Sequence, residues 1–285
     1  MKISKISLLY TVYIIAITGF FLYYLFPSDT LKTYLVYRLS QGNPDITVTI
    51  DHVSPIIPPG INMHDVGIFQ QNKALVDLDN LKIMPGILSL FSAKSTVNFK
   101  GRVNAGTFSG RAEIDDNSGR LEVKGDGRIS GIQVQGIPAL QRLPADKIAG
   151  VLNGDFTYAT AGPNRSLEGK LTLSQFRVEL NKAVFNLKSL EFRDVDAELM
   201  LKNDTLTIKN TTARGNQLDA DLTGTIELTG ENVLDLTVSV TPHHLLLAKI
   251  EKNLPMDFLR KQKAGNAAIS FNIDGTLDEP GFSLN

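Results

Sequence analysis

The chain has 285 residues, a formal net charge of −1 and no cysteine. A charge so close to neutral gives no electrostatic basis for binding nucleic acid. The lack of cysteine excludes disulfide bonds, thiolate metal ligands and cysteine catalysis. The 23 glycines fall mostly between segments that read as strands, which is typical of an all-β domain.

The run from Ile6 to Phe26 contains no charged residue. As a helix it would be about 30 Å long, enough to cross the hydrocarbon core of a membrane. Lys2 and Lys5 precede it, so the positive-inside rule predicts a cytoplasmic N-terminus and export of everything after Pro27. A cleaved signal peptide and a buried soluble helix are the alternatives. The run exceeds the usual apolar region of a signal peptide and no A-x-A-like site follows, so we predict an uncleaved anchor.

Residues 27–44 are predicted to form a juxtamembrane amphipathic helix. Ser28 or Asp29 can cap its start, and Gly42-Asn43-Pro44 ends it. Helical spacing places one apolar face on Leu31, Tyr34, Leu35 and Leu39.

The hydrophobic period then changes to two, and we predict one antiparallel β domain over residues 45–285. Its first strands are expected near residues 46–50, 61–70 and 74–83. Pro58, Pro59 and Gly60 cannot sit inside a strand ladder, because proline has no N–H to donate. They are interpreted as a tight link with Gly60 at positive φ, and as a candidate docking turn for a partner.

From Ser95 onward, half-apolar strands recur with turns roughly every 10–15 residues, which predicts hairpins with one dry and one wet face. Short helices are expected at residues 87–91, 139–147 and 243–263. The in-phase positions predict a shared apolar face that contains Leu199, Leu201, Leu222, Ile226, Leu236 and Val238.

No catalytic, cofactor or metal site is predicted. His52 and His64 flank the proline turn. They could form a metal site, but the preferred interpretation is two exposed polar residues of strands. The acid pairs spaced by two are interpreted as the wet faces of strands. No H-E-x-x-H, G-x-S-x-G or phosphate-loop motif is present, so we expect no enzyme activity.

Three features occur in order: the anchor, a V-x-P-x-x-P-P-G-x-x-x-x-x-V element from Val53 to Val66, and G-T-L-D-E-P-x-F from Gly275 to Phe282. In this the chain resembles the type II secretion system protein N family and is similar to AsmA-like periplasmic proteins. The resemblance implies a mainly β fold with an elongated, curved antiparallel sheet, an N-terminal transmembrane helix and a few short helices. It also implies a single-pass protein of the bacterial inner membrane, with the bulk in the periplasm.

Two functions follow from the resemblance. The first is a non-enzymatic structural or adaptor component of type II secretion, whose partners are other envelope proteins of that system. The second is a lipid-binding or lipid-transfer groove, in which phospholipid lies on the apolar face and small residues such as Gly125, Gly127 and Gly224 permit curvature. An ordinary packed core remains an alternative interpretation of that face.

Overall fold

A computed structural model gives the structure of the chain and describes most of its residues. These are residues 5–41, 46–57, 59–86, 94–117, 120–142, 145–161, 164–184, 187–229, 232–243, 246, 268–276 and 279–284. The predicted helix at 87–91 and nearly all of the one at 243–263 lie outside these residues.

The chain contacts divide the protein into two units, Met1–Met84 and Pro85–Asn285. The described strands pair antiparallel, and within each unit their order in the sheet follows their order in the chain. This arrangement needs only hairpin connections, as period-two segments separated by short turns predict. The prediction of a mainly β, antiparallel protein is therefore confirmed.

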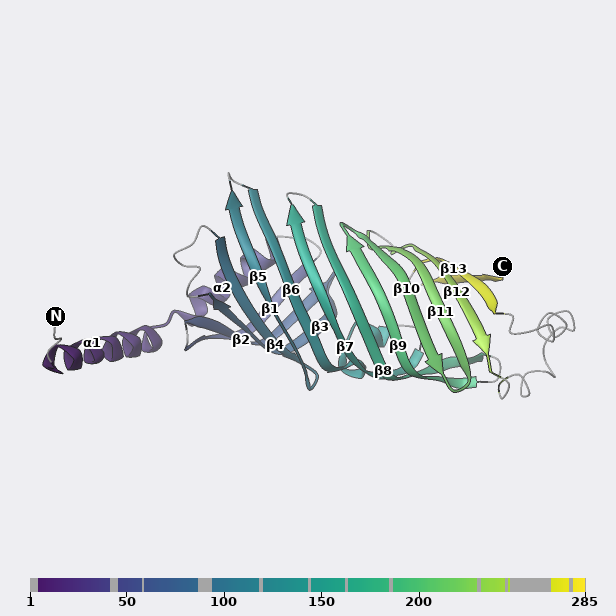
Figure 1. Ribbon diagram of the computed structural model, residues 1–285, viewed down its shortest axis with the longest axis horizontal. Coiled ribbons are helices and arrows are strands. Elements are labelled where there is room, and N and C mark those ends of the chain that lie inside the picture. The colour runs from purple at the N-terminus through teal and green to yellow at the C-terminus, as the bar shows by residue number, and fades with distance from the viewer. Residues whose placement is uncertain are drawn as a thin grey trace, which may run out of the picture. The chain divides into compact units, whose positions relative to one another are not determined.

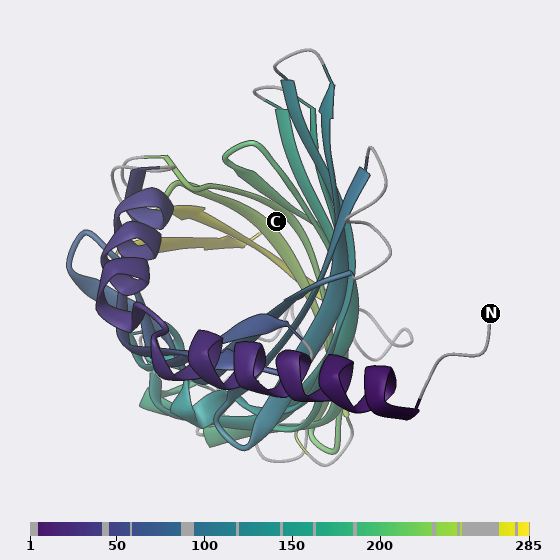
Figure 2. The same ribbon diagram turned by 90° about the vertical axis from the view of Figure 1, so that its left-hand side faces the viewer.

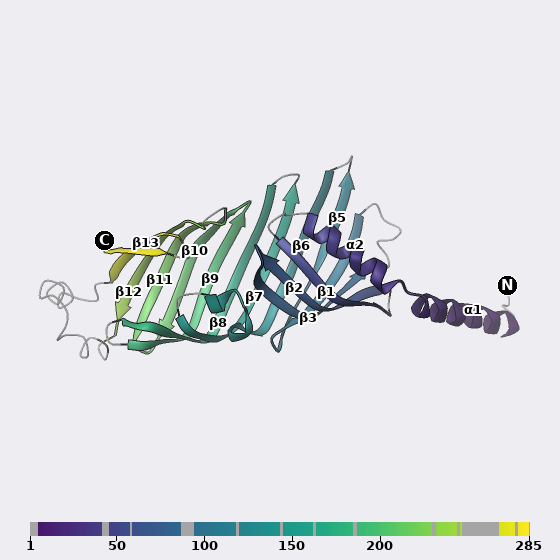
Figure 3. The same cartoon turned by 180° about the vertical axis from the view of Figure 1, so that it is seen from behind.

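The first unit contains three strands, β1 (Ile46–Ile56), β2 (Gly60–Gln70) and β3 (Lys73–Pro85). Helix α2 (Ser28–Gln41) packs on β1 (Figure 3). The Lys32 Nζ atom donates to the Asp51 carbonyl at 2.7 Å, and the Val48 N–H donates to the Ser40 hydroxyl at 3.4 Å. These two bonds tie both ends of the helix to the strand.

The hairpin of β1 and β2 has a closed core. Val53 and Met63 lie directly opposite each other and are the largest fully buried side chains, at 0 % and 1 % exposure. The predicted apolar face of α2 is only half right. Leu31 and Leu35 are half-buried, whereas Tyr34 is exposed and its hydroxyl accepts a hydrogen bond from Arg38.

Helix α1 spans Lys5–Tyr24 and covers most of Ile6–Phe26, the segment predicted to cross a membrane. Its described apolar side chains are largely exposed, for example Leu9 at 71 % and Phe20 at 63 %. By the combined test of length and apolarity, none of the helices in the described part of the chain qualifies as a membrane span.

The second unit is a succession of hairpins (Figure 1). Its elements are β4 (Lys94–Val103), β5 (Gly106–Asn117), β6 (Arg120–Gln133), η2 (Val134–Gly136), η3 (Leu140–Arg142), β7 (Ala145–Ala161), β8 (Asn164–Val184), β9 (Leu187–Lys202), β10 (Thr205–Gly215), β11 (Leu218–Glu227), β12 (Leu234–Pro242), β13 (Ile269–Gly275) and β14 (Pro280–Leu284). The short helix predicted at 139–147 is found only in part: among the described residues of that range, Leu140–Arg142 forms the 3₁₀ turn η3, and β7 begins at Ala145.

The sheet of the second unit is bent along its longer strands (Figure 2). Bulges interrupt the register of several pairs, including β6 with β7 and β9 with β10, and such bulges increase twist and bend. Gln175, at φ 53°, lies in β8 where the register with β7 shifts, between the pairs Ala149–Arg177 and Val151–Ser174. Curvature of this unit therefore has identifiable local causes in the backbone.

Candidate functional site: the apolar face of the second unit

Directly opposed residues of antiparallel strands share one face of a sheet, so the register assigns every position to a face. Three rows of opposed positions cross the second unit on the same side and define its apolar face. The first row is Phe99, Gly110, Gly127, Phe156, Gly169, Leu199, Ile208, Gly224, Leu236, Ile273 and Phe282. The second is Gly101, Phe108, Ile129, Gly154, Leu171, Ala197, Thr211, Leu222, Val238, Phe271 and Leu284. The third is Val97, Ala112, Gly125, Tyr158, Leu167, Leu201, Leu206, Ile226 and Leu234.

The six residues predicted to form an apolar face all lie in these rows, two in each. They are Leu199 and Leu236 in the first row, Leu222 and Val238 in the second, and Leu201 and Ile226 in the third. The sequence prediction was confined to β9, β11 and β12. The register shows that the same face continues to β4 in one direction and to β14 in the other.

Most of this face is only half-buried. Ile208, Leu234 and Leu236 are buried and form one small cluster, with Leu199 and Leu222 packed against it. The other described apolar side chains of the three rows are half-buried or, in the case of Phe282 at 72 %, exposed. A closed core of this size would bury most of its members, so much of the face has no protein cover among the described residues.

Aromatic rings on the face lie over glycines of neighbouring strands. The ring of Phe99 occupies the space where a Cβ at Gly110 would project, and the ring of Phe156 does the same at Gly127. The two rings stack with centroids 6.5 Å apart although β4 and β7 are three strand spacings, about 14 Å, apart. Glycine at these two positions lets the rings converge, as expected on the inner side of a bent sheet.

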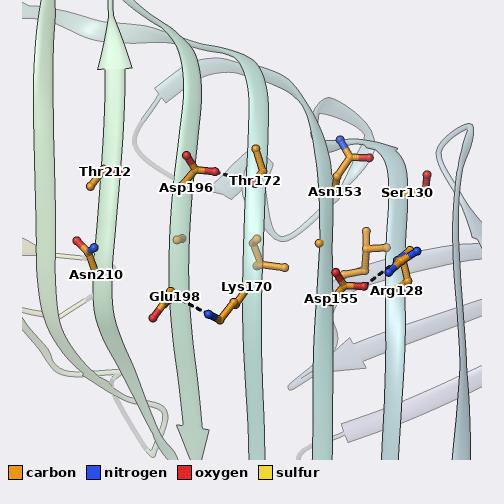
Figure 4. Close-up of a pocket in the computed structure, with 14 residues that line it drawn as sticks. Arg128, Ser130, Asn153, Asp155, Lys170, Thr172, Asp196, Glu198, Asn210 and Thr212 are labelled. Atoms are coloured by element: carbon orange, nitrogen blue, oxygen red, sulfur yellow. Dashed lines mark hydrogen bonds and ion pairs between the residues drawn. The ribbon is translucent and has the colours of Figure 1, made fainter.

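The opposite face of the same strands is polar. It carries a hollow of about 560 Å³, lined by residues of β6 to β10 (Figure 4). Arg128, Asp155, Lys170, Glu198 and Asn210 follow one another there as directly opposed positions on five consecutive strands.

The charges in this hollow compensate one another. Arg128 Nε donates to Asp155 Oδ1 at 2.7 Å, and Lys170 Nζ lies 3.0 Å from Glu198 Oε1. The hydrogen bond to Asp155, with its negative charge, raises the pKa of Arg128 above the usual value. Because these groups already have partners and remain in water, the hollow is a weaker candidate for a binding site than the apolar face.

The predicted docking turn is only partly described. Pro58 lies outside the described residues, Pro59 is exposed, and Gly60 is the first residue of β2, opposite Ile56. The prediction of positive φ at Gly60 is wrong, since Gly60 is not among the glycines with that geometry. A Cβ at Gly60 would instead lie 2.6 Å from the Ile83 carbonyl oxygen, so close approach of β3 accounts for the glycine. The sequence gives no sign of that contact.

His52 and His64 do meet across the first hairpin, with ring centroids 6.1 Å apart. His64 Nε2 lies 2.6 Å from the Asn62 amide nitrogen and 3.5 Å from the Ser54 hydroxyl, so polar neighbours already occupy one side of its ring. Within the described ranges, no three His, Cys, Asp or Glu side chains are grouped as metal ligands. The other two histidines are adjacent in the sequence. His243 contacts Asp219 at 3.3 Å, and His244 lies outside the described residues.

Comparison with known proteins identifies no relative. No protein-family model, no curated protein and no solved structure matches the chain. The resemblance to the secretion protein N family and to AsmA-like proteins therefore stays a prediction.

Proposed function

We propose that the second unit binds the acyl chains of lipids along its apolar face. The observation that carries this proposal is an apolar surface continuous over eleven strands and mostly half-buried. Contiguous exposed apolar surface is unfavourable in water and usually marks a site where another apolar molecule binds. Ten strand spacings of about 4.8 Å give the face a length of about 48 Å, enough for extended chains.

The bend of the sheet favours this function over a flat contact with another protein. Phe99 and Phe156 converge on the apolar side, so the face is concave near β4 to β7. A concave, mostly apolar surface with few polar groups is the usual form of a site for an apolar ligand. The opposite face, with its compensated ion pairs, is suited to remain in water.

Photo-crosslinking from neighbouring positions of β8 tests the proposal. Leu171 lies on the apolar face and Lys170, its neighbour, on the polar face with 81 % of its side chain exposed. A photoreactive phenylalanine analogue at position 171 should form lipid adducts in cells, detected by mass spectrometry of the purified protein. The same analogue at position 170 is the matched control and should form none. Equal adducts at both positions, or none at 171, contradict the proposal.

We further propose that α1 anchors the chain in the bacterial inner membrane, with both units in the periplasm. The uncharged run from Ile6 to Phe26 and the exposed apolar side chains of α1 support anchoring. A reporter active only in the periplasm, fused after Asn285, should be active. Release of the protein from membranes by high salt, or a silent reporter, contradicts anchoring.

The adaptor function in type II secretion is a second candidate, favoured by one observation. Ile57, beside the predicted docking turn, is 91 % exposed, and an isoleucine so exposed at a hairpin tip suits contact with a partner protein. Ile57→Ser should then abolish secretion of a type II substrate without changing thermal stability. Gln71→Ser, in the next hairpin turn of the same unit, is the control and should secrete normally. Normal secretion by Ile57→Ser contradicts a role of this turn.

A further inference from the structure

One charged residue stands in register with the apolar face. Ser95, Ile114, Val123, Thr160 and Arg165 form a fourth row beside the three described above, near the hairpin that joins β7 to β8. On β8, Arg165 follows the same alternation as Leu167, Gly169 and Leu171. Among the residues named in these four rows whose side chains the structure describes, Arg165 is the one that carries a charge.

Arg165 is exposed, and no ion pair joins its guanidinium to any described residue. Its backbone is held firmly, because Arg165 N donates to Asn203 Oδ1 at 3.1 Å and Asn203 N donates to the Arg165 carbonyl at 2.8 Å. By contrast, the arginines of the polar face, such as Arg128 and Arg177, are paired with carboxylates. Arg165 is thus a free cation at a fixed position at the end of an apolar surface.

We propose that Arg165 binds the anionic head group of an amphiphile whose acyl chain lies on the apolar face. The inference rests on the lipid-binding function proposed above and adds the head-group class and the residue that recognises it. Arginine suits this position because its aliphatic stem can lie along apolar surface while the guanidinium stays in water. Its planar fork can donate two hydrogen bonds to one phosphate or carboxylate. The ligand class is therefore a phosphate- or carboxylate-bearing lipid.

A pair of probes that differ only in charge tests this proposal on the full chain in detergent. The probes are a fluorescent dodecanoic acid and its methyl ester, titrated by fluorescence against wild type, Arg165→Gln and Lys202→Gln. Lys202 is the matched control. It lies opposite Ser166, the residue after Arg165, so it is at the same end of the sheet but in register with the polar face. Thermal melting of each variant checks the fold, which an exposed substitution should leave unchanged.

Wild type should bind the acid more tightly than the ester. Arg165→Gln should weaken binding of the acid by at least about tenfold, the loss expected when one hydrogen bond to a charged group is removed. Binding of the ester should not change, and Lys202→Gln should match wild type with both probes. If Arg165→Gln binds the acid as wild type does, or if Lys202→Gln is equally weakened, the inference is overturned while lipid binding stands. If neither probe binds wild type, the proposed function itself fails.

Displacement of the bound acid separates the two sources of the anion. Oleoyl lysophosphatidic acid acting at lower concentration than oleate assigns the site to phospholipids, and the reverse order assigns it to fatty acids. Both orders support an anion contact at Arg165. Displacement by lysophosphatidylcholine at the same concentration as lysophosphatidic acid overturns recognition of net negative charge.

Discussion

The two units use the same antiparallel pairing but bury their apolar side chains to different degrees. In the first unit, α2 lies against β1, and Val53 and Met63, opposite each other on β1 and β2, are fully buried. In the second, eleven strands share an apolar face that is mostly half-buried. The difference shows that regular alternation predicts which side chains share a face but not whether that face is covered. A half-buried apolar face can serve the stability of the fold or the binding of a ligand. Substitutions at buried and half-buried positions distinguish these two roles.

The largest expected effect is in the closed hairpin. Val53→Asp places a carboxylate at a position with 0 % exposure and no partner for it, which should destabilise the unit by more than about 3 kcal/mol. Such a loss is a large part of the stability of a small domain. His52→Asp, at the neighbouring exposed position, is the control and should melt like wild type. Comparable melting of both variants by circular dichroism would mean that the hairpin core is not closed.

Two leucines of the second unit, one buried and one half-buried, allow the same comparison. Leu236 is buried at 8 % exposure with Ile208 and Leu234, whereas Leu222 is half-buried opposite Val238. Leu236→Asp should cost several kcal/mol, on the order of 2–4, because its carboxylate loses water. Leu222→Asp should cost less, since its carboxylate can stay hydrated, and should reduce lipid adducts instead. Limited proteolysis and lipid analysis of the same preparations measure both effects. Equal loss of protease resistance would indicate one closed core.

Glycines give a smaller and more local comparison. At Gly60 a Cβ would lie 2.6 Å from the Ile83 carbonyl oxygen, whereas at Gly169 the nearest atom to a Cβ would be 3.9 Å away. Gly60→Ala should therefore lower the free energy of unfolding by about 1–3 kcal/mol, as overpacking does. Gly169→Ala should be neutral or stabilising by roughly 0.4–1 kcal/mol, because alanine restricts the unfolded chain. A stable Gly60→Ala variant would contradict the close approach of β3.

The sequence predicts the fold of this protein better than its site. Strands near residues 61–70 and 74–83 and the shared phase of Leu199, Leu222 and Leu236 follow from periodicity alone, because a period of two is a local property. Two of the failures concern contacts between elements, which a single sequence does not display. Gly60 is explained by the close approach of β3, and Tyr34 is exposed although α2 packs on β1. The cross-strand register is likewise non-local.

Arg165 illustrates that limit on the site. In the sequence it is an ordinary arginine after the turn residues Gly162-Pro163-Asn164. In the structure, its pairing with Thr160 assigns it to the apolar face. A strict extension of the alternation from Leu171 back through Leu167 could have found it, because the positions two, four and six before Leu171 share its face. The sequence therefore held the signal for this residue, but not for the strands opposite it.

The smallest expected effect concerns the ion pairs of the polar face. Lys170 Nζ lies 3.0 Å from Glu198 Oε1, with 81 % and 49 % of the two side chains exposed. Because water screens exposed pairs, the coupling energy from a double-mutant cycle of Lys170→Ala and Glu198→Ala should be only about 0.2–1 kcal/mol. It should fall further when salt is raised toward 1 M, where the Debye length is about 3 Å. Denaturant unfolding of the four proteins at low and high salt measures this coupling. A coupling above about 2 kcal/mol that persists in high salt would show that this face is buried against another molecule. The polar face, and not the apolar face alone, would then be a binding surface.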